Sequence, residues 1–257
     1  MGTHLLNSKA KIEERVRAGS ITWREPLLML FSRLLLFALF QAIIAVLFYL
    51  NGHADPWQAS IPYWLLTATL TNITCFILLS LLTRREGIRL LDLYRVEAHS
   101  FWREAPIFLG ILLISAPLVA LPNPLLGAWF FGDANIPFKM MFQPIPLWLN
   151  YLLIVLFPIS IALTEIPTYY AYVMPRLMAL SGRSWPVLIG VACMHAAQHI
   201  TLPLIFNGTF ILWRLLMFLP FALWVAFVIY KRPRQMPYLM LVHAFLDASL
   251  PFLFLTL

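Results

Sequence analysis

The stretch 147-LWLNYLLIVLFPISIALTEIPTYYAYVMPRL-177 decides the fold of this chain. Its apolar part exceeds the roughly 20 residues that a helix needs to cross the hydrocarbon core of a bilayer. One acidic residue, Glu165, lies inside it. An ionised carboxylate at bilayer depth costs roughly 2.5–3.5 kcal/mol by insertion scales, so such residues usually face a polar cavity and mark a functional site. The stretch therefore predicts a membrane-spanning helix that carries a functional side chain.

The rest of the chain is similarly apolar. Of its 257 residues, 61% are hydrophobic and 11% are charged, which leaves too few polar groups to cover a water-soluble surface. We expect an all-α, polytopic helical bundle that forms one integral membrane domain over 1–257, with 1–26 as an N-terminal arm. The Pro-rich segment 122–146 adds an eighth span if it enters the bilayer. The seven candidate spans are near 27–50, 61–83, 106–121, 147–175, 185–206, 210–230 and 237–255.

Basic residues predict how the spans are oriented, because lysines and arginines collect in the cytoplasmic loops of membrane proteins. They cluster here in the N-terminal arm and after the second, fourth and sixth candidate spans. The three loops on the opposite side contain one basic residue, Lys139. We therefore expect the N-terminus in the cytoplasm and the C-terminus outside, in a bacterial inner membrane. The net charge of +7 indicates contact with anionic lipid headgroups and does not call for a nucleic-acid partner.

Four more ionisable residues lie in apolar runs. His195 and His199 stand four apart, so they share one face of a helix, and the same spacing relates His243 to Asp247. The carboxylate of Asp247 would orient the imidazole of His243. A lone histidine in such a run is more often a satisfied core residue. The combination with two acids on separate spans favours one shared polar site.

Glu165 also has phenols close by in the sequence. Tyr169 and Tyr170 follow it, and their hydroxyl groups would donate hydrogen bonds to a carboxylate inside a helix-lined cavity. A buried glutamate in such a setting suits a general acid or base. The alternative is an interhelical hydrogen-bond anchor that carries out no chemistry.

A metal site is a further alternative, because Glu165 and the four residues above are all potential ligands. His195 and His199 are spaced like a zinc-binding pair, but Ala196 stands where a metalloprotease helix carries its glutamate. We therefore expect no cofactor and no resident metal. A divalent ion would become possible if all five side chains converged.

These residues resemble the motifs of the CPBP intramembrane proteases, the family that includes the type II CAAX prenyl proteases. The first motif of the family is similar to Glu-Glu-x-x-x-Arg-Gly-Tyr-x-x-Pro-Arg-Leu. The second has a histidine four residues after a phenylalanine, and the third is His-x-x-x-Asn or Asp. The departures are Ile166, Tyr170 and Ala171 in the first motif and His195 in the second. The matching positions, all within 147–250, are Glu165, Tyr172, Pro175-Arg176-Leu177, His199, His243 and Asp247.

The resemblance implies an intramembrane peptidase that hydrolyses a peptide bond with an activated water. Its implied partners are membrane lipid and a membrane-associated or lipidated peptide or protein substrate. Two other functions stay open: a non-catalytic scaffold or immunity protein that binds such a partner, and a proton-coupled carrier. The absence of paired, Gly-interrupted half-helices in the sequence disfavours the carrier. The implied roles are water activation for Glu165 and His199, oxyanion stabilisation for His243 and Asp247, and accessory contacts for His195, Tyr169 and Tyr170.

The peptidase hypothesis requires the side chains of Glu165, His199 and His243 to meet. Counted from the nearest basic boundary residue at 1.5 Å per residue, they lie ~17, ~24 and ~14 Å inside the membrane. Helix tilt, or a broken start to the fifth span at Pro186, would close this gap. We expect a shared polar cavity near the middle of the bilayer that opens toward the cytoplasm.

Overall fold

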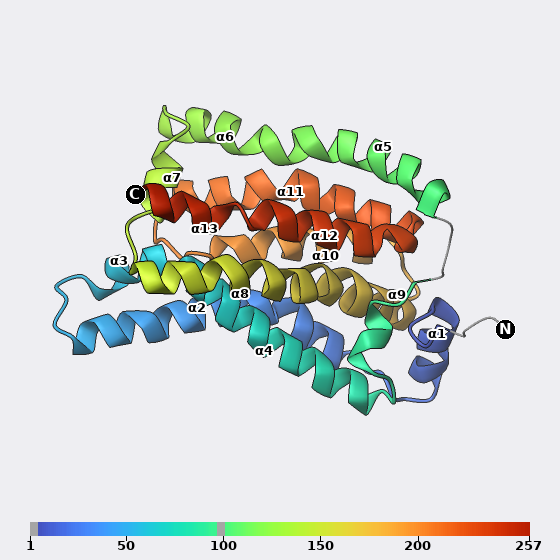
Figure 1. Cartoon of the computed structure of the whole chain (residues 1–257). Coiled ribbons are helices and arrows are strands. Elements are labelled where there is room, and N and C mark those ends of the chain that lie inside the picture. Colours follow the sequence, from blue (N-terminus) through green and yellow to red (C-terminus); the bar gives the residue numbers. More distant parts are fainter. Residues whose placement is uncertain (1–4, 97–100) are drawn as a thin grey trace.

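The computed structural model describes residues 5–96 and 101–257 (Figure 1). Within these residues every regular element is helical, and the one extended pairing is an isolated bridge between Thr201 and Leu204. Six helical segments are long and apolar enough to cross a membrane, so the chain is a multi-pass integral membrane protein. The six are Arg24–Leu50, Pro56–Arg85, Trp102–Phe131, Leu147–Ser181, Gly208–Lys231 and Pro233–Thr256.

Two of these rods are single helices and four join shorter elements. The single helices are α2 (Arg24–Leu50) and α11 (Gly208–Lys231). The joined elements are α3 (Pro56–Ser60), η1 (Ile61–Tyr63) and α4 (Trp64–Arg85); α5 (Phe101–Ala120) and α6 (Pro122–Phe131); α8 (Leu147–Ile166), η3 (Pro167–Val173) and α9 (Met174–Ser181); and η5 (Pro233–Gln235), α12 (Met236–Asp247), α13 (Leu250–Leu253) and η6 (Phe254–Thr256). The remaining elements are α1 (Lys9–Arg17), η2 (Leu90–Leu93), α7 (Ile136–Met141), α10 (Trp185–Ala197) and η4 (Gln198–Ile200).

The expected count of seven or eight spans is therefore not confirmed, and the difference lies in two segments. The fifth expected span, 185–206, is helical as α10 for 13 residues, which is about 20 Å at 1.5 Å per residue. It then tightens into η4, and Pro203 has no amide hydrogen to continue a helix. Within the expected extra segment 122–146, α6 continues the rod that α5 begins, so it adds no separate span.

The helices form a bundle with two distinct ends (Figure 1). α1 and α9 lie at one end, whereas α3, α7 and α13 lie at the other. α4 packs between α2 and α8, α12 packs on α8, and α10 packs on α11. The rod of α5 and α6 lies on the outside against α11, and only 11% of its most apolar stretch is buried inside the protein, compared with 50% for Pro56–Arg85. This rod is therefore the most peripheral of the six candidate spans.

The rod from Leu147 to Ser181 changes its winding just after Glu165. Pro167 has no amide hydrogen, and residues Pro167–Val173 form a π-helical turn before the α-helix resumes at Met174. All seven residues of this turn are buried. A π-helical turn adds a residue within the rod, so it changes the direction in which the following side chains point. Glu165 and the tyrosines that follow it are thereby placed on the inward side of one rod.

The loop after α4 is fixed to this rod close to Glu165. Tyr94 donates its phenolic hydrogen to the backbone oxygen of Leu163 at 2.7 Å. Burial raises the pKa of Tyr94 to about 12. The hydroxyl therefore stays protonated, and remains a donor, throughout the physiological pH range.

A buried ion pair joins α9 to the end of α4. Arg176 donates to both carboxylate oxygens of Glu86 at 2.7 and 2.6 Å, and its guanidinium lies 4.0 Å from the ring centre of Tyr172. Asn7 and Arg15 of the N-terminal arm reach the same group: Asn7 accepts from Arg176 at 3.2 Å, and Arg15 Nε lies 3.6 Å from Glu86. The N-terminal arm is thus packed into the bundle rather than separate from it.

Replacing Glu86 by glutamine should lower the free energy of unfolding by about 3–5 kcal/mol, because it leaves the fully buried Arg176 without its carboxylate. Thermal or denaturant unfolding of the purified protein in detergent measures this change. Glu13→Gln is the matched control: Glu13 meets the exposed Lys9 at 3.8 Å, and such surface pairs contribute at most about 1 kcal/mol. Equal stability of the two variants would contradict the importance of the pair.

Candidate functional site

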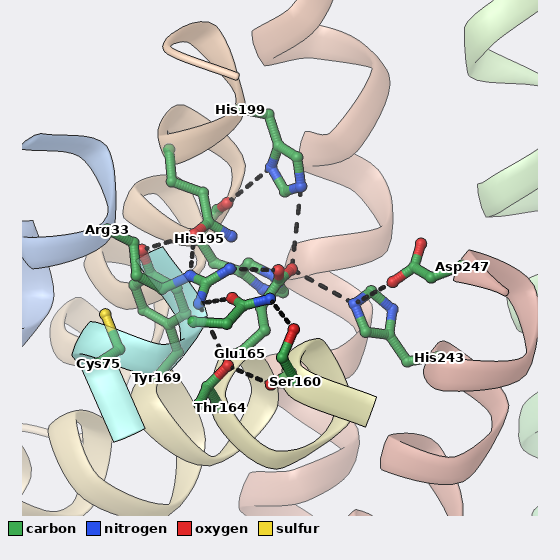
Figure 2. Close-up of polar contacts among 12 residues, drawn as sticks. Arg33, Cys75, Ser160, Thr164, Glu165, Tyr169, His195, His199, His243 and Asp247 are labelled. Atoms are coloured by element: carbon green, nitrogen blue, oxygen red, sulfur yellow. Dashed lines mark hydrogen bonds and ion pairs between the residues drawn. The ribbon is translucent and has the colours of Figure 1, made fainter. Parts of the chain in front are cut away.

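The five ionisable residues singled out by the sequence line one cavity of about 100 Å³. They come from three parts of the chain, namely α8, the α10–η4 segment and α12, and the structure brings them together (Figure 2). The cavity is lined by Glu165, His195, His199, His243 and Asp247, together with Leu118, Val119, Met217, Phe218, Phe221, Ala222 and Leu246.

One carboxylate oxygen of Glu165 is the centre of the site. Its Oε1 lies 2.8 Å from Nε2 of His195, 3.5 Å from Nε2 of His243 and 3.9 Å from Nε2 of His199. The Glu165 side chain is 1% exposed. Three imidazole nitrogens therefore surround a single buried oxygen atom, at distances over which protons exchange directly or through one water.

The other oxygen of Glu165 forms an ion pair with a residue that the sequence analysis did not single out. Oε2 accepts from Arg33 Nη2 at 2.8 Å, and Arg33, near the middle of α2, is fully buried. The same guanidinium donates to Oε1 of Gln198 at 2.5 Å and to Oδ1 of Asn72 at 2.7 Å. The sequence does contain a signal for Arg33: it is a cation inside the apolar run 27–50, and buried charges in membranes are usually paired with an opposite charge.

His195 is the imidazole nearest to Glu165, and a second hydrogen bond fixes its ring. Its Nδ1 lies 2.7 Å from the hydroxyl of Tyr170, which also lies 3.0 Å from the backbone oxygen of Ala222. In the neutral ring, Nε2 carries the hydrogen and donates it to Glu165 Oε1 at 2.8 Å, and Nδ1 accepts from Tyr170. Tyr169 stacks on the imidazole at 4.9 Å and donates to Gln198 at 3.3 Å.

His199 presents a free nitrogen to the cavity. Its Nδ1 lies 3.1 Å from the backbone oxygen of His195, so Nδ1 carries the hydrogen and, in the neutral ring, Nε2 holds a lone pair. The ring stacks on Phe218 at 3.6 Å. Arg214 donates to the backbone oxygens of His199 and Leu202, which fixes the segment after the imidazole. The Nε2 lone pair is thereby held toward Glu165 Oε1.

His243 and Asp247, both on α12, complete the lining of the site by ionisable residues. They lie one turn apart near the end of α12, with His243 Nε2 at 3.3 Å from Asp247 Oδ2. Both atoms are buried and neither makes a hydrogen bond within the described residues, although each faces the cavity. The pair is therefore oriented by proximity and charge, while its hydrogen-bonding capacity is left for whatever occupies the cavity.

Two residues that depart from the family motifs, His195 and Tyr170, make direct contacts in the site. His195, which stands where the resembling motif has phenylalanine, lies closer to Glu165 than His199 does. Tyr170, which stands where that motif has arginine, bonds His195, and a guanidinium reaches Glu165 from Arg33 instead. Tyr172, at the matching tyrosine position, stacks on Arg176. The accessory residues expected from the sequence, His195, Tyr169 and Tyr170, all belong to the network around Glu165.

The same side chains are potential ligands for a metal ion. Within residues 5–96 and 101–257, no group of three or more His, Cys, Asp or Glu side chains has the geometry to hold a metal ion. The largest set of potential ligands surrounds Glu165, and its shortest contact is the 2.8 Å hydrogen bond between His195 and Glu165.

Comparison of the chain with known protein families, with characterised proteins and with solved structures found no match. The geometry of the site therefore carries the functional argument.

A double-mutant cycle would measure how strongly Arg33 and Glu165 depend on each other. Arg33→Gln and Glu165→Gln should each lower the free energy of unfolding by about 3–5 kcal/mol, because each strands the opposite buried charge. The double variant should lose clearly less than the sum of the two, since it leaves no unpaired charge. Denaturant unfolding in detergent gives the three values, and Arg24→Gln, at an exposed position, is the control. Additive losses would show that the pair is not coupled.

Proposed function

We propose that this chain is an intramembrane peptidase of the CPBP type, which hydrolyses a peptide bond inside the bilayer with a water activated by Glu165 and His199. One observation carries the proposal: Glu165 Oε1 and the lone pair of His199 Nε2 lie 3.9 Å apart on the wall of one buried cavity. A water beside this line is within hydrogen-bond reach of both atoms. The carboxylate takes its proton as the oxygen attacks the carbonyl carbon.

The surrounding residues hold the water-activating pair in position. Arg33 binds the second oxygen of Glu165, so the carboxylate has one orientation, with Oε1 toward the cavity. His195 binds Oε1 from the side and is itself held by Tyr170. Preorganisation of this kind is what a positioned general base requires, because the groups need not reorganise during the reaction.

The cavity walls suggest the kind of substrate. Val119 of α5 and Leu246 of α12 line the cavity, and their side chains are 39% and 45% exposed. An apolar wall that reaches the bilayer suits a membrane-embedded or lipidated peptide. Such a substrate would reach the site without crossing a layer of water.

We also propose that the chain crosses the membrane seven times, with a cytoplasmic N-terminus, in a bacterial inner membrane. α1 and α13 lie at opposite ends of the bundle, which an odd number of crossings requires (Figure 1). α10, η4 and the following residues 201–207 supply the seventh passage between α9 and α11. The clustering of basic residues on the α1 side supports the orientation.

A second candidate function, a non-catalytic membrane scaffold or immunity protein, is favoured by one observation. Both oxygens of Glu165 already have partners at 2.8 Å, as in a purely structural anchor. In that function the small cavity would be a packing defect, and a peptide or lipidated partner would bind elsewhere on the bundle. Variants of the cavity residues separate the two functions.

Two substitutions test the peptidase. Glu165→Gln removes the base, and His199→Asn keeps a donor near the Nδ1 position while removing Nε2. Each should reduce hydrolysis at least about 100-fold, the lower range for a lost general base. The assay uses purified protein in liposomes with a panel of single-span and lipidated peptides, and mass spectrometry detects the new termini.

Folding is the control for both variants, because Glu165→Gln also strands Arg33. His199→Asn leaves that ion pair intact, so its unfolding midpoint should stay close to that of the wild type. Glu13→Gln, on the exposed face of α1, should cleave normally. Binding or protective phenotypes that survive both cavity substitutions, without any cleavage, would instead support the scaffold.

Metal independence is a further expected outcome of a mechanism that rests on a carboxylate and imidazoles. Hydrolysis should be unchanged after prolonged treatment with a chelator, and elemental analysis of purified protein should find less than one equivalent of zinc. Loss of activity on chelation, restored by one added divalent metal, would assign Glu165, His199 and His243 as ligands instead.

A further inference from the structure

His243 lies between two carboxylates. Its Nε2 is 3.5 Å from Glu165 Oε1 and 3.3 Å from Asp247 Oδ2. Acceptor oxygens on both sides place a hydrogen on this nitrogen. That hydrogen is engaged by neither carboxylate in hydrogen-bond geometry, and the nitrogen faces the cavity. A buried N–H donor is thus available to a substrate.

Charged side chains of both signs surround this N–H group. The carboxylates of Glu165 and Asp247 together carry two negative charges, and Arg33 supplies one positive charge. An imidazolium at His243, with His195 and His199 neutral, completes a neutral set in a buried site, where net charge is costly. The carboxylate of Asp247 beside a developing oxyanion would oppose it by repulsion. The pair is therefore better suited to giving up a proton than to holding a negatively charged oxygen.

We propose that His243 is the acid that protonates the leaving amine nitrogen, and that Asp247 is its positioning residue. This assignment rests on the proposed peptidase function and replaces the oxyanion role that the motif resemblance implies for the two residues. His243 is the third imidazole around Glu165 Oε1, on a helix separate from the one that carries His195. Water activation and amine protonation are therefore divided between different helices, α8 and η4 for the water and α12 for the amine.

The proton balance closes within the residues of the site. Water adds its oxygen to the carbonyl carbon and gives one proton to Glu165 Oε1. The carbon–nitrogen bond of the tetrahedral intermediate then breaks as His243 Nε2 transfers its proton to the nitrogen, which leaves as an amine. The proton on Glu165 returns across the 3.5 Å contact to His243, which restores both groups. The net reaction consumes one water and one peptide bond and yields one carboxylic acid and one amine.

A pair of substrates that differ in the leaving group tests this role. A peptide that the wild type cleaves is compared with the same peptide in which sulfur replaces the scissile N–H group, in liposomes. A thiol has a pKa of about 8.5, so a thiolate leaves without a proton, whereas an amine does not. His243→Gln keeps an N–H donor near the Nε2 position but has no proton to transfer. It should lower amide hydrolysis at least about 100-fold and thioester hydrolysis less than about 10-fold.

The other outcomes are distinct. Equal losses on both substrates, or retention of amide hydrolysis by His243→Gln, would assign His243 to the oxyanion and overturn the proposal. Asp247→Asn should show the same selectivity for the thioester with a smaller loss, and it provides a second arm if His243→Gln is unstable. His53→Gln, in an exposed loop, should match the wild type on both substrates. A wild type that hydrolyses neither substrate class would overturn the peptidase function itself.

Discussion

The ion pair between Arg33 and Glu165 is the interaction on which the interior of the bundle depends. Moving either charge from water into a low-dielectric interior costs several kcal/mol, so neither residue is tolerated there without the other. The guanidinium joins α2 to three other elements, because it binds Glu165 of α8, Asn72 of α4 and Gln198 of η4. Helices that share only apolar contacts in a membrane have many near-equal packings, and a charged group with fixed partners selects one of them.

This selection also accounts for the geometry of the candidate site. Arg33 takes one oxygen of Glu165, which leaves the other oxygen to face the three imidazoles. The π-helical turn after Glu165 then brings Tyr169 and Tyr170 against His195. A change of register at Pro167 and a cation on a distant helix therefore leave one oxygen of the buried carboxylate facing the cavity.

Much of this organisation was predictable from the sequence, for identifiable physical reasons. Apolar runs of sufficient length identified the six long rods, and the spacing of four residues placed His195 with His199 and His243 with Asp247 on common helix faces. The rarity of acids in apolar runs identified Glu165. These are local signals, and each needs only one stretch of the chain.

The sequence analysis missed features that depend on contacts between residues far apart in the sequence. Arg33 and Glu165 are 132 residues apart, and no spacing rule relates them. The shortness of α10 was hidden because most of residues 198–206 are as apolar as those of a spanning helix, while the Arg214 side chain that holds the backbone of this segment lies in the next helix. α5 and α6 form one rod that packs against α11, and hydropathy does not report such packing.

The peripheral position of α5 and α6 places one wall of the cavity close to the outer surface of the bundle. One apolar rod, largely uncovered by the rest of the protein, lines part of the cavity through Leu118 and Val119. In the proposed peptidase, acyl chains would form an outer layer around this wall, and their order and thickness would help to set how much water reaches Glu165. The reactivity of the carboxylate would then depend on the bilayer as well as on the polypeptide.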